Sequence, residues 1–227
     1  MNVERAIGAV LRIRPLTETS LIVHWLTREH GRIAAVAKGA RRPKSPYRGH
    51  LDLFYLTEIT FSRSRRSDLH TLREARLLES HSALRRNLES LRQASYCAAL
   101  IEQTTEADTP IPGVYELFTG FLKNMTTQPP QPRTIFAFEI KLLEELGLKP
   151  DLAESRLTVG SRRILESLMA SDWPAIFQLR LSDAQTTELR LFLHGFLIYH
   201  LEKIPRGRSR AINSIERESV EMSAYNQ

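Results

Sequence analysis

The first 80 residues alternate between apolar and polar positions with the period of two that is typical of β-strands. The first such run has Ile7, Ala9, Leu11 and Ile13 on one face and ends at Pro15. The same pattern predicts further strands over residues 20–26, 32–37, 53–61 and 69–78. Five strands with short turns and one long loop favour a small closed barrel. The OB-fold, a five-stranded Greek-key barrel, fits this count best, and an SH3-like barrel is the alternative.

From Ser82 onward the apolar positions recur every three or four residues, which is the period of an α-helix. This pattern predicts helices over residues 84–101, 112–125, 135–146, 164–169 and 182–199. Gly147 follows the third of these as a stop signal, and Ser182 with Gln185 has the spacing of a capping box. The apolar face of the last helix is expected to contain Leu189, Phe192, Phe196 and Tyr199.

The change of period divides the chain into a part made of strands and a part made of helices, an α+β organisation. We expect an OB-fold domain over residues 1–80 and an α-helical domain over residues 81–205, with the apolar stripes as its core. Residues 206–227 have few apolar side chains, so the sequence predicts a mobile C-terminal tail.

The basic residues are concentrated in the predicted barrel. Residues 1–76 contain 15 Lys and Arg side chains against 7 Asp and Glu, whereas the rest of the chain contains 17 against 19. The net charge of +6 therefore arises in the N-terminal part. A basic module joined to a nearly neutral one is typical of a protein that binds a polyanion such as a nucleic acid.

The segment of residues 38–48, KGARRPKSPYR, contains five cations and no acidic residue, and its glycine and prolines favour a loop. Such a loop presents cations and mobile backbone N–H groups to phosphates. The candidate DNA-binding cations here are Lys38, Arg41, Arg42, Lys44 and Arg48. Tyr47 stands among them, which predicts that it stacks on an unpaired base. A solvated loop that binds nothing is the alternative.

A second basic cluster, Arg63, Arg65 and Arg66, lies between the last two predicted strands. In an OB-fold the loops between strands 1 and 2 and strands 4 and 5 flank the binding face. Arg14 ends the first strand near the first of these loops, so we include it among the candidate DNA-binding residues. Trp25 lies within an apolar strand, and we expect it in the core.

The sequence contains none of the catalytic motifs sought. It has no GxxxxGK[ST] phosphate loop, no GxSxG motif and no histidines at metal-ligand spacing. The single cysteine, Cys97, is expected to be a buried and inert thiol. Glu139, Glu144 and Glu145 are interpreted as solvated side chains on a helix face. We therefore expect a protein that is not an enzyme, with no catalytic residue, no metal and no cofactor.

No apolar run approaches the roughly 18 residues that a membrane span needs. The N-terminal residues also lack the apolar stretch and cleavage site of a secretion signal. We therefore expect a cytoplasmic protein that does not contact membranes.

Several short motifs in the N-terminal part occur in the order seen in a known family. Arg14 is followed by ETS at residues 18–20, LTRE at 26–29 and GR at 31–32, and then by VAKGARR at 36–42. A later helix begins its apolar face with FE at residues 138–139 and ends with LG at 146–147. These motifs resemble those of the bacterial RecO family of recombination mediators.

The resemblance implies a mediator of recombination in DNA repair, in the cytoplasm and associated with the bacterial nucleoid. Proteins of this family bind single- and double-stranded DNA and anneal complementary strands. They engage the C-terminal tail of the single-stranded-DNA-binding protein (SSB), form a complex with RecR and so help RecA to load. The residues alone leave two alternatives open, an RNA-binding OB-fold module and an adaptor for an acidic protein tail.

One segment departs from the family pattern. Many members carry a four-cysteine zinc motif after the helix that ends in LG. Here residues 148–160 contain no cysteine, so we expect the zinc finger to be absent.

Overall fold

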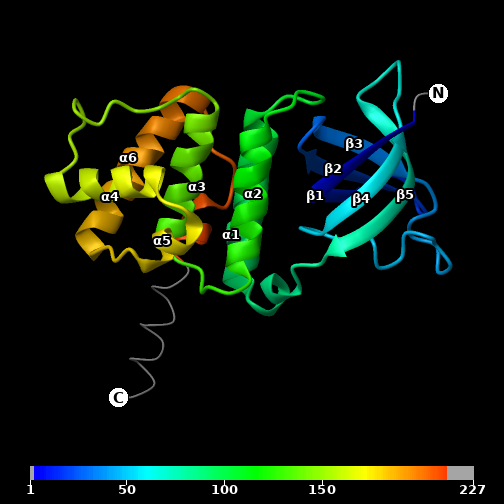
Figure 1. Cartoon of the computed structure of the whole chain (residues 1–227), viewed down its shortest axis with the longest axis horizontal. Coiled ribbons are helices and arrows are strands. Elements are labelled where there is room, and N and C mark those ends of the chain that lie inside the picture. Colours follow the sequence, from blue (N-terminus) through cyan, green and yellow to red (C-terminus); the bar gives the residue numbers. More distant parts are fainter. Residues whose placement is uncertain (1–2, 214–227) are drawn as a thin grey trace, which may run out of the picture. The chain divides into compact units, whose positions relative to one another are not determined.

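The computed structural model describes residues 3–213, which begin with a closed five-stranded barrel (Figure 1). Its strands are β1 (Val3–Pro15), β2 (Leu21–Thr27), β3 (Gly31–Ala37), β4 (Leu56–Ser62) and β5 (Leu69–Glu79). The strand order is β1-β2-β3-β5-β4, and β4 pairs back with β1 to close the barrel. All neighbours are antiparallel except β3 and β5, which run parallel. This arrangement confirms the predicted OB-fold and excludes the SH3-like alternative.

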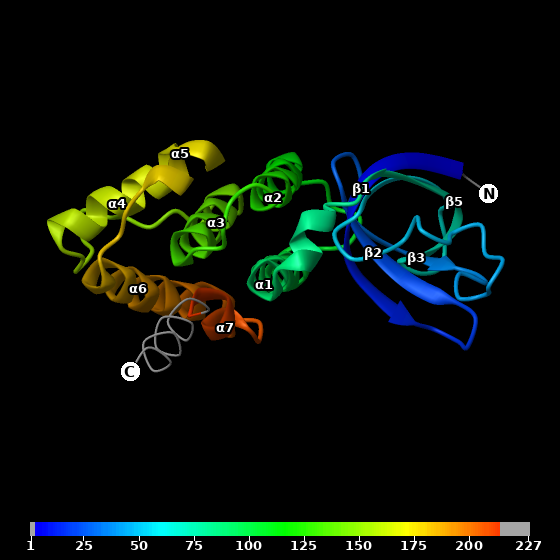
Figure 2. The same ribbon diagram turned by 90° about the horizontal axis from the view of Figure 1, so that it is seen from below.

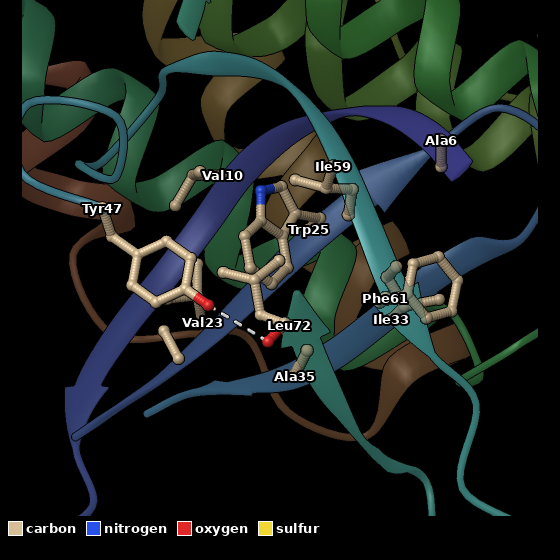
Figure 3. Close-up of a cluster of buried hydrophobic side chains, with 11 residues drawn as sticks. Ala6, Val10, Val23, Trp25, Ile33, Ala35, Tyr47, Ile59, Phe61 and Leu72 are labelled. Atoms are coloured by element: carbon tan, nitrogen blue, oxygen red, sulfur yellow. Dashed lines mark hydrogen bonds between the residues drawn. The ribbon is translucent and has the colours of Figure 1, made fainter. Parts of the chain in front are cut away.

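The interior of the barrel is filled by large apolar side chains from all five strands (Figure 3). Trp25 is fully buried, and its indole Nε1–H donates to the hydroxyl oxygen of Thr57 at 2.9 Å. A buried indole needs such an acceptor, because an unpaired N–H in an apolar core is costly. The predicted core position of Trp25 is confirmed.

The alternating apolar residues of β1 do not all lie on the inner face of the barrel. Ile7 is 41% exposed, whereas Ala6 and Val10 belong to the barrel core. The register between β1 and β2 shifts between Val10 and Arg12, as at a β-bulge. Ala9 is nevertheless buried, since both faces of this strand are covered along part of its length. A simple alternation therefore does not identify the inner face here.

The helices follow the barrel in the chain (Figure 1). They are η1 (Ser82–Arg86), α1 (Leu88–Thr104), α2 (Pro112–Met125), α3 (Pro132–Glu145), α4 (Val159–Ala170), α5 (Trp173–Gln178), α6 (Asp183–Leu201) and α7 (Arg208–Ile212). All five predicted helices are present, and α5 and α7 are additional. The predicted capping box is confirmed, because Ser182 and Gln185 exchange side-chain to backbone hydrogen bonds at the start of α6. Gly147 follows α3 with a φ of +76°.

The predicted apolar face of α6 needs correction. Its buried side chains are Leu189, Leu193 and Leu197, which follow one another at intervals of four residues. Tyr199 is 82% exposed and lies outside this stripe. The helix has apolar side chains on most of its circumference, so the sequence alone does not indicate which row packs inward.

The expected tail from residue 206 is partly ordered, since the chain continues beyond α6 into α7 (Figure 2). Arg208 of α7 is buried, and its Nε and Nη2 atoms donate to Glu139 of α3 at 2.7 and 2.8 Å. The Tyr96 hydroxyl donates to the same carboxylate at 2.6 Å. Glu139 is therefore fully buried and paired rather than solvated as predicted. The rest of the expected tail, residues 214–227, lies outside the described residues.

The chain forms two compact units that are interleaved in sequence. The first contains Met1–Ser82 and Ile101–Leu122, and the second contains Ala83–Leu100 and Lys123–Gln227. In the second unit α3 contacts α4, α5, α6 and α7. The part of the chain around the α1–α2 connection therefore groups with the barrel. The division into domains at residues 80 and 205 stays a prediction.

Replacing Arg208 by alanine should destabilise the protein strongly. The change leaves the carboxylate of Glu139 buried without its cationic partner, and breaking a buried pair in this way costs about 3–5 kcal/mol. Urea unfolding of the full chain measures the loss. Arg206 is an exposed arginine just before α7, and Arg206→Ala is the matched control. This change should alter stability by no more than about 0.5 kcal/mol. Equal effects of the two changes would contradict this account.

Candidate nucleic-acid interface

The long loop between β3 and β4, residues 38–55, is folded into a series of tight turns. The backbone N–H of Arg42 donates to the carbonyl of Gly39, that of Ser45 to Arg42, and that of Arg48 to Ser45, at 3.0 to 3.2 Å. Gly39 takes a φ of +70°, which favours glycine at the start of this path. These amides are used inside the loop, so the expectation of mobile N–H groups for phosphates is corrected. The loop instead offers its side chains.

The beginning of this loop lies against the loop between β1 and β2, residues 16–20. The backbone N–H of Arg41 donates to the carbonyl of Thr19 at 2.9 Å, and its guanidinium contacts the carbonyl of Thr17 at 3.3 Å. Arg14 is exposed at the end of β1, immediately before residues 16–20. The structure thus brings the β1–β2 loop together with the basic loop after β3, whereas the OB-fold interpretation predicted that the β1–β2 and β4–β5 loops flank the binding face.

The same basic loop also shares a groove with the loop between β4 and β5, residues 63–68. The groove has a volume of about 700 Å³. The cationic side chains that line it are Lys38, Arg63, Arg65, Arg66 and Arg73. Ser62, Ser64 and Thr71 add hydroxyl groups, and Leu69 with Leu72 adds apolar surface. The groove therefore joins Lys38 of the basic loop to the arginines of the β4–β5 loop and β5 in one cationic depression on the barrel.

Tyr47 is not an exposed stacking platform, which corrects the prediction. Its side chain belongs to the barrel core, and the residue is 8% exposed (Figure 3). The hydroxyl reaches the carbonyls of Leu72 and Arg73 on β5, at 3.1 and 3.2 Å. Burial raises the pKa of this phenol above its ordinary value. Tyr47 fastens the basic loop to β5 and forms part of the groove wall.

Arg63 is also placed differently from the exposed cation that the sequence predicts. Its Nε lies 2.9 Å from a carboxylate oxygen of Glu4, and its Nη1 lies 2.6 Å from Asp108. The hydrogen bond from Arg63 lowers the pKa of Glu4, and in return the bond to Glu4 raises the pKa of Arg63. Two carboxylates offset the charge of Arg63, so it contributes less to the groove than its neighbours do.

The other candidate cations are not neutralised. Eight are exposed and pair with no carboxylate among residues 3–213: Arg14, Lys38, Arg41, Arg42, Lys44, Arg48, Arg65 and Arg66. Elsewhere in this unit arginines do have acidic partners, as Arg28 has Glu116 and Arg12 has Glu102. Like charges gathered at one surface repel one another, and a bound polyanion relieves that repulsion.

Arg73 is a groove residue that sequence reasoning missed. It lies within β5, where Arg76 is paired with Glu58, whereas the other cations were found because they cluster in loops along the chain. Its Nε donates to the hydroxyl of Ser62 on β4 at 2.8 Å. The signal that identifies it is spatial, because the parallel pairing of β3 and β5 brings it to the same groove as Lys38.

The residues do not fit the zinc site that the family resemblance implies. Cys97, the single cysteine of the chain, is buried in α1, and burial raises the pKa of its thiol well above the ordinary value. A zinc ligand must be a thiolate, so this environment opposes metal binding. Within the described residues, no group of three or more His, Cys, Asp and Glu side chains is arranged to hold a metal ion.

Among residues 3–213, no helix has both the length and the apolar character that crossing a membrane requires.

A closed five-stranded OB-fold barrel with an exposed cationic groove defines the class of the protein, an OB-fold module followed by helices. The family models described as "Recombination protein O N terminal" and "Recombination protein O C terminal" match residues 1–81 and 85–155. The chain belongs to the RecO family.

Several relatives support this membership. The chain is 35% identical over 153 residues to the DNA repair protein RecO of Rhodopirellula baltica, which covers 67% of this chain and 56% of the relative. It is 32% identical over 145 residues to that of Bacillus subtilis, covering 64% and 56%. A Cyanothece relative matches at 28% identity over 226 residues, covering 97% and 74%. The aligned part thus spans about half the length of several of these relatives.

Replacing Tyr47 by phenylalanine should lower stability without changing nucleic-acid binding. The change leaves the carbonyls of Leu72 and Arg73 without this donor, which costs about 1 kcal/mol. Chemical denaturation and oligonucleotide titration of the same sample measure the two effects. A large loss of affinity with unchanged stability would mean that the hydroxyl contacts the nucleic acid rather than β5.

Elemental analysis of the purified chain, without chelator treatment, should find far less than one zinc per molecule. The reason is that the chain has one cysteine, whose thiol is buried. Zinc bound tightly at one per chain would contradict this reading of the site.

Proposed function

We propose that this protein is a non-enzymatic, DNA-binding recombination mediator in DNA repair, which binds single- and double-stranded DNA and anneals complementary strands. The observation that carries the proposal is the groove of about 700 Å³ lined by Lys38, Arg65, Arg66 and Arg73. Membership of a family whose relatives are named DNA repair proteins supports it. The chemistry is the non-covalent recognition of phosphates.

Phosphate binding fits the groove because its cations are exposed and come from two loops and a strand on a rigid barrel. The guanidinium groups of Arg65 and Arg66 match the geometry of phosphate oxygens, and nearby hydroxyls such as that of Ser64 supply further donors. Most of these contacts carry no base identity, so we propose that binding is largely independent of sequence.

The exposed cations outside the groove suggest how two strands are brought together. Arg41, Arg42, Lys44 and Arg48 do not line the groove, although they belong to the same loop as Lys38. We propose that the groove holds one strand and that these four cations attract a second. Annealing then follows because protein charge screens the repulsion between two polyanions held close together.

The partners we propose are RecR, the C-terminal tail of SSB and, indirectly, RecA. This part of the proposal rests on the family membership. We place the acidic SSB tail on the second unit, although Lys141 of α3 does not offer it an exposed cation. Lys141 is half-buried, its Nζ donates to the carbonyl of Met169 at 2.7 Å, and burial lowers its pKa. We further propose that the protein acts in the bacterial cytoplasm, at the nucleoid.

Neutralising the groove should flatten the salt dependence of DNA binding. Each phosphate contact on a single strand contributes about 0.7 to the slope of log K against log salt, so replacing Lys38, Arg65 and Arg66 by alanine should reduce it by about two. The loss should be similar for unrelated DNA sequences. Fluorescence anisotropy of one labelled oligonucleotide across a salt series measures the slope, and circular dichroism checks the fold.

A second triple variant, Arg41, Arg42 and Lys44 to alanine, distinguishes the groove from the outer face of the loop. If the groove holds one strand and the outer cations attract the second, this variant should impair strand annealing more than it impairs the binding of one strand. Unchanged slopes in both variants would contradict the proposed function. Competition with an RNA oligonucleotide of matched length separates the RNA-binding alternative, which requires RNA to bind more tightly than DNA.

A further inference from the structure

One carboxylate contacts both ends of the loop between β4 and β5. Arg63 is the first residue after β4, and its Nη1 lies 2.6 Å from Oδ1 of Asp108. His70 lies just after the start of β5, and its Nε2 is 3.3 Å from the same oxygen. The Nδ1 of His70 accepts from the backbone N–H of Ser64 at 3.4 Å, which leaves Nε2 as the donor to Asp108. The carboxylate of Asp108 therefore connects the two ends of the loop between β4 and β5.

Asp108 is itself held firmly against the barrel. It lies in the connection between α1 and α2, and its backbone N–H donates to the carbonyl of Arg32 on β3 at 2.9 Å. The guanidinium of Arg32 donates to the carbonyl of Thr105 at 2.9 Å. The approach is so close that a Cβ on Gly31 would lie 2.0 Å from the carbonyl oxygen of Thr109. The segment that presents Asp108 is thus fixed to the turn before β3.

Glu4 completes the clamp from β1. Both of its carboxylate oxygens accept from Nε of Arg63, at 2.9 and 3.1 Å. The buried ring of His70 stacks on Phe61, with ring centroids 5.3 Å apart, so the second attachment point is rigid as well. Arg63 is therefore held by two acidic groups from different parts of the first unit.

We propose that Asp108 and Glu4 are positioning residues that fix the loop of residues 63–68 so that Arg65 and Arg66 point into the groove. The inference rests on the proposed function of that groove. Electrostatics alone makes these carboxylates unfavourable, because a negative charge beside a phosphate site repels the ligand. Holding the loop in one conformation compensates, since a preorganised loop does not lose its freedom when it binds.

Charge repulsion by Asp108 weakens DNA binding, whereas its fixing of the loop strengthens binding. Because these effects are opposite, Asp108→Asn in the full chain tests the proposal. Removing one negative charge should tighten DNA binding if charge alone matters. We expect weaker binding, by about tenfold, because the neutral amide of Asn holds Arg63 and His70 less strongly than the carboxylate does, so the loop is freer at both ends. Hydrogen exchange at residues 64–69 of the free protein should become faster, and this readout needs no DNA.

Asp68→Asn is the matched control, because it removes the same charge from the exposed part of the same loop. It should leave binding unchanged or make it tighter. Thr57→Val, which removes the acceptor of the Trp25 indole, destabilises the barrel elsewhere and controls for a general loss of stability. It should not weaken binding as Asp108→Asn does. Asp108→Glu retains the carboxylate and should recover part of the lost affinity.

The proposal is overturned if Asp108→Asn tightens binding as Asp68→Asn does, or if exchange in residues 64–69 is unchanged. It is also overturned if Thr57→Val, at the same loss of stability, weakens binding equally. In each case the proposed function stands, provided that the groove variant lacking Lys38, Arg65 and Arg66 loses affinity. If that variant binds normally, the proposed function fails and this inference fails with it.

Discussion

The parallel pairing of β3 with β5 is the constraint on which the candidate interface depends. The register places Ala34 beside Leu69 and Val36 beside Thr71. Because the strands run in the same direction, the residues that follow, Lys38 and Arg73, reach the same groove. The groove is lined by the first residues of β5 as well, so it also includes Arg65 and Arg66 of the loop before β5. Without this pairing, the two clusters would be separate charged loops with no common ligand.

The arginines of the first unit have two different roles. Some arginines are paired with carboxylates and hold the fold together, as Arg63 is held by Glu4 and Asp108. Others, such as Arg65 and Arg66 two and three residues further on, have no acidic partner among the described residues. The paired arginine fixes the backbone, and the unpaired ones extend from it. This arrangement explains how a loop rich in serine and arginine keeps its cations together despite their repulsion.

The sequence predicted the strands, most helices and the two basic loops, because period and clustering are local properties. It failed where a position depends on distant residues. Glu139 was expected to be solvated, whereas Tyr96 and Arg208, which are distant in the sequence, pair its buried carboxylate. Tyr47 stands among cations along the chain, yet its hydroxyl has acceptors on β5. Arg73 was overlooked because it lies within a strand and not in either of the two basic loops.

The central claim is that the barrel groove, rather than the helices, holds DNA, and hydrogen exchange of the full chain with and without a single-stranded oligonucleotide tests it most directly. The account predicts slower exchange on binding at residues 38–48 and 62–73, around the groove. Little change is expected in α3 to α7. Protection confined to residues 123–213, with none in the barrel, would contradict it.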